Sequence, residues 1–130
     1  NAVHLDTKVF IGGTLQTGSI YGYENSSNSG SSYGSSNGST VSRLTVAPIG
    51  NATGEHITGS LNLRNVNSST FTFNYFGSNN LYNTSGDHQS TKSHGMLAGA
   101  NRTSIINGFR LHFNSGNIAS GTVKLYGVRT

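Results

Sequence analysis

The chain has 130 residues, and 29 of them are Leu, Ile, Val or Phe, slightly above the roughly 20% below which a chain is expected to be disordered. Its net charge of +4 comes from Lys and Arg residues scattered along the chain, whereas nucleic-acid-binding proteins concentrate basic residues on one face, so we expect no nucleic-acid partner. The chain contains no Cys, which excludes thiolate zinc sites, and no apolar run approaches the ~20 residues that cross a bilayer, so we expect no membrane partner.

Gly, Ser, Thr and Asn together supply about half of the residues, while Ala, Glu, Lys and Met are few. Thr suits strands, and Asn, Gly and Ser suit the turns between them, so the composition favours strands over helices. We therefore predict an all-β protein. The predicted architecture is an antiparallel β-sandwich, jelly-roll-like, with an N-terminal arm and long polar loops.

Residues 1–23 are predicted to form an N-terminal arm or edge strands. Their apolar patches are short and are interrupted by polar residues and by Gly12-Gly13, and a detached apolar segment at a terminus often docks on a neighbour or a sheet edge. Residues 24–40 are rich in Ser, Gly and Asn and are predicted to be a loop, because they offer almost no apolar area to bury. Tyr33 lies in this segment, and a Tyr among Ser, Gly and Asn is also typical of adaptable binding loops.

The β-sandwich domain is predicted to occupy residues 41–130. Alternation of apolar and polar residues predicts strands within it, and 65–69 has the length of a hairpin turn. Residues 77–93 are predicted to be a second polar loop, anchored by Leu81-Tyr82. The connection 114–121 is too long for a tight hairpin, so we expect it to cross between sheets or wrap an edge. The predicted strands are 41–46, 57–63, 70–76, 105–113 (odd positions inward) and 122–128.

The titratable residues give little support for catalysis. Glu55-His56 and Asp87-His88 are adjacent pairs, and adjacent residues of a strand point to opposite faces. His88 and His94 lie near Asp87 and could in principle share a metal, but solvated surface histidines are the interpretation that we prefer. The sequence has no HExxH, EF-hand, phosphate-loop or GxSxG motif. We therefore predict that the protein is not an enzyme and uses no metal or cofactor.

Aromatic residues beside polar segments are the remaining candidates for binding. Their rings could stack on sugars, although a loop Tyr more often attaches its loop to the domain. The candidate ligand or partner contacts are Tyr21, Tyr23, Tyr33, Tyr82 and His88.

The stretch INGFRLHFNSGNIASGTVKLYGV, from Ile106, resembles the closing segment of many structural proteins of tailed bacteriophages. In that group an alternating strand with a hydrophobic-Arg pair leads into SGN, then I-x-SGT and a short LYG strand. Residues 59–70, GSLNLRNVNSST, also resemble a hairpin of the group, whereas the segment before Val41 departs from its opening strands. The matching residues of the closing stretch are Ile106, Phe109, Arg110, Leu111, Phe113, Ser115–Asn117, Ile118, Ser120–Thr122 and Leu125–Gly127.

The resemblance implies a non-enzymatic β-sandwich protein of the bacteriophage virion that decorates the capsid or forms part of a head or tail fibre. Virion proteins work through repeated symmetric contacts, so the expected partners are copies of the same chain, most simply in a trimer, and other capsid or fibre subunits. The alternative is a carbohydrate-binding module at a fibre tip that recognises a glycan of the host surface. A third reading, a secreted adhesion domain, rests on Asn-x-Ser/Thr sequences that also arise by chance in such a composition.

Overall fold

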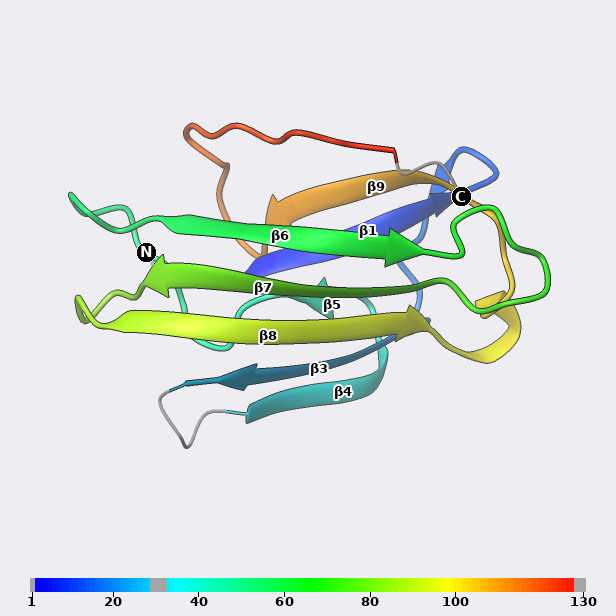
Figure 1. The fold of residues 1–130 in the computed structure, drawn as a ribbon, viewed down its shortest axis with the longest axis horizontal. Helices are drawn as coiled ribbons and strands as arrows, with labels where there is room; N and C mark the ends of the chain where they lie inside the picture. Colours follow the sequence, from blue (N-terminus) through cyan, green and yellow to red (C-terminus); the bar gives the residue numbers. More distant parts are fainter. Residues whose placement is uncertain (1, 29–32, 128–130) are drawn as a thin grey trace.

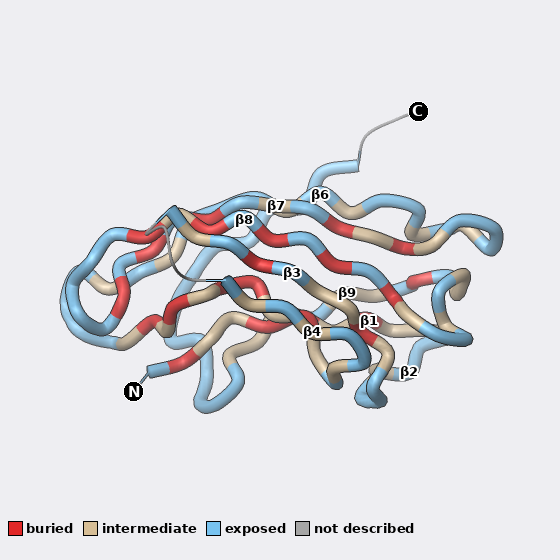
Figure 2. Tube along the Cα trace, turned by 90° about the horizontal axis from the view of Figure 1, so that it is seen from below, coloured by how far each residue is buried: buried red, intermediate tan, exposed pale blue. Residues whose placement is uncertain are grey.

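The computed structural model describes residues 2–28 and 33–127. Its strands form one five-stranded and one four-stranded sheet, stacked as two layers (Figure 1). Figure 2 shows that buried positions gather between the two layers. The prediction of an all-β antiparallel sandwich is confirmed.

Every neighbouring pair in the five-stranded sheet is antiparallel. The β3–β4, β6–β7 and β7–β8 pairs are consecutive in the chain, whereas β3 and β8 come together from distant parts of it. The strands, in their order across the sheet, are β4 (Tyr33–Ser39), β3 (Tyr21–Ser27), β8 (His88–Leu97), β7 (Asn74–Tyr82) and β6 (Ile57–Arg64).

The four-stranded sheet is built around β1 (Leu5–Ile11). The strand β9 (Ile106–Phe113) pairs with β1 along its whole length, while the two-residue strands β2 (Thr14–Leu15) and β5 (Ser42–Arg43) pair with its two ends. The segment predicted as an arm or edge therefore contains an interior strand, and Val9 on it is 1% exposed. The prediction missed this because Asp6, Thr7 and Lys8 interrupt the apolar residues of β1, although Asp6 and Thr7 are themselves buried.

Two segments predicted as polar loops are strands. Residues 24–40 contain the end of β3 and all of β4, which pair with each other, and the tip at 29–32 lies outside the described residues. Residues 77–93 contain most of β7 and half of β8. Backbone ladders form whatever the side chains are, so Ser- and Asn-rich strands are possible where their neighbours pair with them.

The hairpin predicted from residues 57–63 and 70–76 exists, because β6 pairs with β7. Its connection is longer than expected and runs from 65 to 73, since the paired residues at its end are Arg64 and Asn74. Asn65 enters this connection with a positive φ of 58°. Phe71, within the predicted strand 70–76, consequently lies in the connection and is 66% exposed.

Polar side chains of the five-stranded sheet hold the segment that follows β5 in the interior. The carbonyl oxygen of Leu44 accepts hydrogen bonds from Asn79 Nδ2 and Ser93 Oγ, both 2.8 Å long. The carbonyl oxygen of Arg43 accepts a bond from Asn25 Nδ2 at 2.9 Å. These bonds satisfy backbone groups that a strand ladder would otherwise take up. They explain why the strand predicted for 41–46 is reduced to two residues.

An ion pair between a buried carboxylate and a partly exposed guanidinium joins β1 to β5. Asp6 Oδ1 lies 3.2 Å from Arg43 Nε, and the Asp6 side chain is almost fully buried. His4 lies next to this pair with its Nδ1 3.3 Å from Thr45 Oγ1. Burial, followed by the charge of Arg43, lowers the pKa of His4 below its ordinary value, so the folded chain favours the neutral imidazole.

The strand predicted for 105–113 is present as β9, but its partner is β1 and not the residues that follow it. An irregularity in the pairing between Phe10 and Ile11 shifts the register, so Ile106 is buried while Ile105 is 50% exposed. The strand predicted for 122–128 is absent as far as the structure describes the chain, which is to residue 127.

Candidate functional site

The outer face of the five-stranded sheet carries a regular array of exposed side chains. Along β7 and β8 the even-numbered residues are mostly exposed and the odd-numbered ones mostly buried, as expected for strands with one wet face. The pairing register places the exposed residues in rows across the sheet. One row contains Asn62, Phe76, His94 and Glu24, and the next contains Ser60, Ser78, Lys92, Ser26 and Tyr33.

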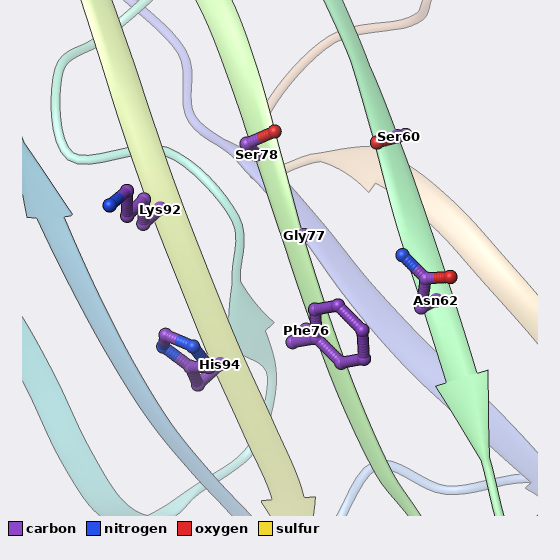
Figure 3. Close-up of a pocket in the computed structure, with 7 residues that line it drawn as sticks. All are labelled: Ser60, Asn62, Phe76, Gly77, Ser78, Lys92 and His94. Carbon is purple, nitrogen blue, oxygen red and sulfur yellow. The ribbon is translucent and has the colours of Figure 1, made fainter.

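A shallow open groove of about 230 Å³ lies between these two rows. Figure 3 shows the Phe76 ring between β6 and β8, with Asn62 and His94 on either side of it and Lys92 and Ser78 in the neighbouring row. Small side chains at Ser60, Gly77 and Ser78 leave this space open beside the Phe76 ring. Its lining residues are Ser60, Asn62, Phe76, Gly77, Ser78, Lys92 and His94.

Basic side chains lie beside this groove. The Arg64 guanidinium lies over the Phe76 ring, 4.8 Å from its centroid, in a cation–π contact. Lys92 and His94 both project from the exposed face of β8. Glu24 is the one acidic residue in the described strands of this face, and it lies opposite His94 on β3.

A second aromatic group lies farther along the same face. Tyr82, at the end of β7, pairs with His88 at the start of β8. The Tyr82 ring centroid is 5.6 Å from that of His56 and 5.8 Å from that of His88, tilted against the first and edge-on to the second. Phe76 and Tyr82 are six residues apart on one strand, which corresponds to about 20 Å.

The structure brings three of the five predicted contact residues together on this outer face. Tyr33, Tyr82 and His88 are exposed there, and Tyr33 is 61% exposed. None of them lies in the kind of long loop that the sequence suggested, because all three belong to strands.

Tyr21 and Tyr23 face the interior. Tyr21 is 2% exposed. Its hydroxyl accepts a hydrogen bond from the Val9 backbone N–H and donates one to the Gln16 carbonyl oxygen, both 3.0 Å long. Burial raises the pKa of Tyr21. Tyr23 pairs with Gly95 on the inner side and is half-buried. Tyr21 is therefore a core residue and not a ligand contact.

The sequence reasoning missed Phe76, Lys92, His94 and Arg64 as members of one surface. Phe76 ends the predicted strand 70–76, Lys92 lies in the predicted loop 77–93, and His94 lies just beyond that loop. The signal was present as a period of two across 74–82 and 88–96. It was hidden because the inward positions of these strands include Asn79, Thr91 and Ser93, which are buried but polar.

A different surface is formed by residues 118–127, which we call the closing segment. It follows β9 and forms no strand pairing, and Figure 1 draws it in orange to red as a chain without a strand arrow. Val123, Leu125 and Tyr126 are 78%, 88% and 77% exposed, and Ile118 is also largely exposed.

Within the described part of the chain, no three His, Cys, Asp or Glu side chains are grouped so that they could hold a metal ion. The same residues contain no helix that is long and apolar enough to span a membrane. Comparisons with models of protein families, with curated proteins and with solved structures find no match.

Proposed function

We propose that this chain is a non-enzymatic structural protein of a bacteriophage virion that works by binding other protein chains. The observation that carries the proposal is the closing segment, where three large apolar side chains in four residues are exposed to solvent. Burying a Val or Leu side chain is worth about 1.5–3 kcal/mol, so the segment has a strong drive to pack against another surface. The resemblance of its sequence to closing segments of virion proteins supports the same reading.

The closing segment has the apolar–polar alternation of a β-strand, but it pairs with none of the described strands. Val123 and Leu125 alternate with Thr122, Lys124 and Tyr126, and this period of two suits an edge strand. A matching edge exists on β9, which pairs with β1 on one side and has no strand described on its other side. We propose that the closing segment of one subunit adds to the β9 edge of another in a homo-oligomer, with a trimer as the simplest closed form.

The mass of the full chain in solution tests this assembly. We expect the unaltered chain to be oligomeric by light scattering or sedimentation, and Leu125→Asp to be monomeric because the carboxylate would be buried in the contact. Ser120→Asp introduces the same charge in the same exposed segment, outside the alternating part, and should keep the oligomer. A full chain that stays monomeric at millimolar concentration would refute the assembly, as would a Leu125→Asp variant of unchanged mass.

The virion assignment needs a separate measurement. In purified particles of a phage that encodes the chain, mass spectrometry should find it in a fixed ratio to the major capsid protein or to a fibre protein. Loss of the chain from particles during density-gradient purification would contradict a structural role.

A further inference from the structure

The outer face of the five-stranded sheet carries three kinds of group that can bind a ligand. It offers positive charge at Arg64 and Lys92, hydrogen-bonding groups at Asn62 and Ser60, and an aromatic ring at Phe76. All five belong to three adjacent strands, so their spacing is set by the sheet and not by a loop. A site on strands needs little ordering when it binds, which reduces the entropy cost.

The charges of this face favour an anion. Arg64 is held over Phe76 by the cation–π contact, and its guanidinium has no acidic partner among the described residues. Lys92 lies on β8, in the row next to that of Phe76, and likewise has no ion pair with a described residue. Guanidinium and ammonium groups are the usual partners of carboxylates, the guanidinium through two parallel hydrogen bonds. Glu24 lies opposite His94, so neither Arg64 nor Lys92 has an acidic residue directly opposite it on a described strand.

The remaining groups favour a sugar over a small inorganic anion. Asn62, Ser60 and Ser78 supply amide and hydroxyl groups of the kind that bond sugar hydroxyls. The groove is open and shallow, and the face continues for about 20 Å along β7 to Tyr82, which suits a chain of sugars lying along the strands. Tyr82, between His56 and His88, presents a second ring at that end.

We propose that the outer face of the five-stranded sheet binds an acidic polysaccharide, with sugar carboxylates on Arg64 and Lys92 and a sugar ring against Phe76. This inference does not depend on the proposed assembly through the closing segment. It uses a different surface, and a monomeric variant would keep it.

Titration calorimetry with the full chain tests the proposal. The probe is an oligomer of galacturonic acid, and the comparisons are a galactose oligomer of the same length and an inorganic polyphosphate of similar charge. We expect the uronic oligomer to bind more tightly than both. Lys92→Gln should weaken that binding by about tenfold, the value of one charge-assisted contact. Phe76→Ala should weaken it as well, while Lys124→Gln, which removes the same charge from the exposed closing segment, should not.

Each alternative outcome overturns the proposal. If the galactose oligomer bound as tightly as the uronic oligomer, the sugar carboxylates would not contribute to binding. Polyphosphate binding as tight as that of the uronic oligomer, and insensitive to Phe76→Ala, would show a general attraction of anions. Failure of the uronic oligomer to bind at low salt would refute the site outright. Because Lys92 is exposed and Phe76 partly so, both variants should fold, and their circular dichroism should match that of the unaltered chain.

Discussion

At the scale of single residues, the buried carbonyl oxygen of Leu44 connects the two sheets through hydrogen bonds. It accepts hydrogen bonds from two side chains, Asn79 and Ser93, which belong to neighbouring strands of the opposite sheet. Either donor alone still satisfies the oxygen, whereas loss of both leaves a buried acceptor without a partner. A single lost hydrogen bond costs about 0.5–1.5 kcal/mol, and an unsatisfied buried group about 1–3 kcal/mol.

We therefore predict that Asn79→Ala and Ser93→Ala are not additive. Each alone should lower the free energy of unfolding by about 1 kcal/mol, and the double variant should lose about 1 kcal/mol more than their sum. Urea titration of the four proteins measures this. The exposed pair Thr58→Ala and Ser78→Ala, on neighbouring positions of the outer face, should be additive and close to neutral. If the effects of Asn79→Ala and Ser93→Ala on the free energy of unfolding were additive, the two side chains would not share the Leu44 oxygen in solution.

At the scale of elements, β1 organises the smaller sheet, since β9, β2 and β5 all pair with it. We predict that a chain lacking residues 1–11 does not fold. It should show no cooperative urea transition and should bind a hydrophobic dye, because β9 loses its partner and the inner face of the larger sheet loses its cover. Removal of residues 118–130 is the matched control, and the shortened chain should keep a cooperative transition. A cooperative urea transition in the chain that lacks residues 1–11 would contradict this prediction.

The contrast between β6 and β8 explains how far the sequence could predict the fold. In β6 the inward residues Ile57, Leu61 and Leu63 alternate with polar ones, and the strand was predicted almost to the residue. In β8 the inward residues include Thr91 and Ser93, so both faces are polar and the period of two is invisible to a hydrophobicity pattern. Strands whose inward side chains bond to backbone carbonyls are recognisable only when those carbonyls are located in space.

The same reason limited the prediction of the candidate site. Tyr33, Tyr82 and His88 were chosen from sequence because aromatic residues among polar ones stand out, and all three lie on the outer face. Phe76 and Lys92 could not be joined to them, since their alignment comes from the β7–β8 register. Residues 122–128 were predicted to be a strand by their alternation. Residues 122–127 do alternate, but none of the described strands pairs with them.

At the scale of the whole molecule, the interior is unusually polar. Among the described residues the buried set contains ten polar or charged residues beside eleven apolar ones. Exposure of polar surface lowers the heat capacity of unfolding while exposure of apolar surface raises it. We predict a heat-capacity change below about 1.6 kcal/mol/K, the lower end expected for 130 residues. Calorimetry of the Leu125→Asp variant avoids a contribution from association, and a value of about 2 kcal/mol/K or more would contradict the prediction.

The hydrogen bonds to the Leu44 and Arg43 carbonyls also decide how the strands can be aligned. A strand that slips by one residue turns every side chain to the other face. For β7 or β8, a slip would move Asn79 or Ser93 to the solvent side and leave the segment after β5 without its donors. Many residues of this sheet are small, polar and similar to one another, so the burial of apolar side chains alone would allow several strand alignments. The buried hydrogen bonds from Asn and Ser can form in only one alignment of the strands. They therefore specify a single structure, which the few apolar residues of this chain could not do alone.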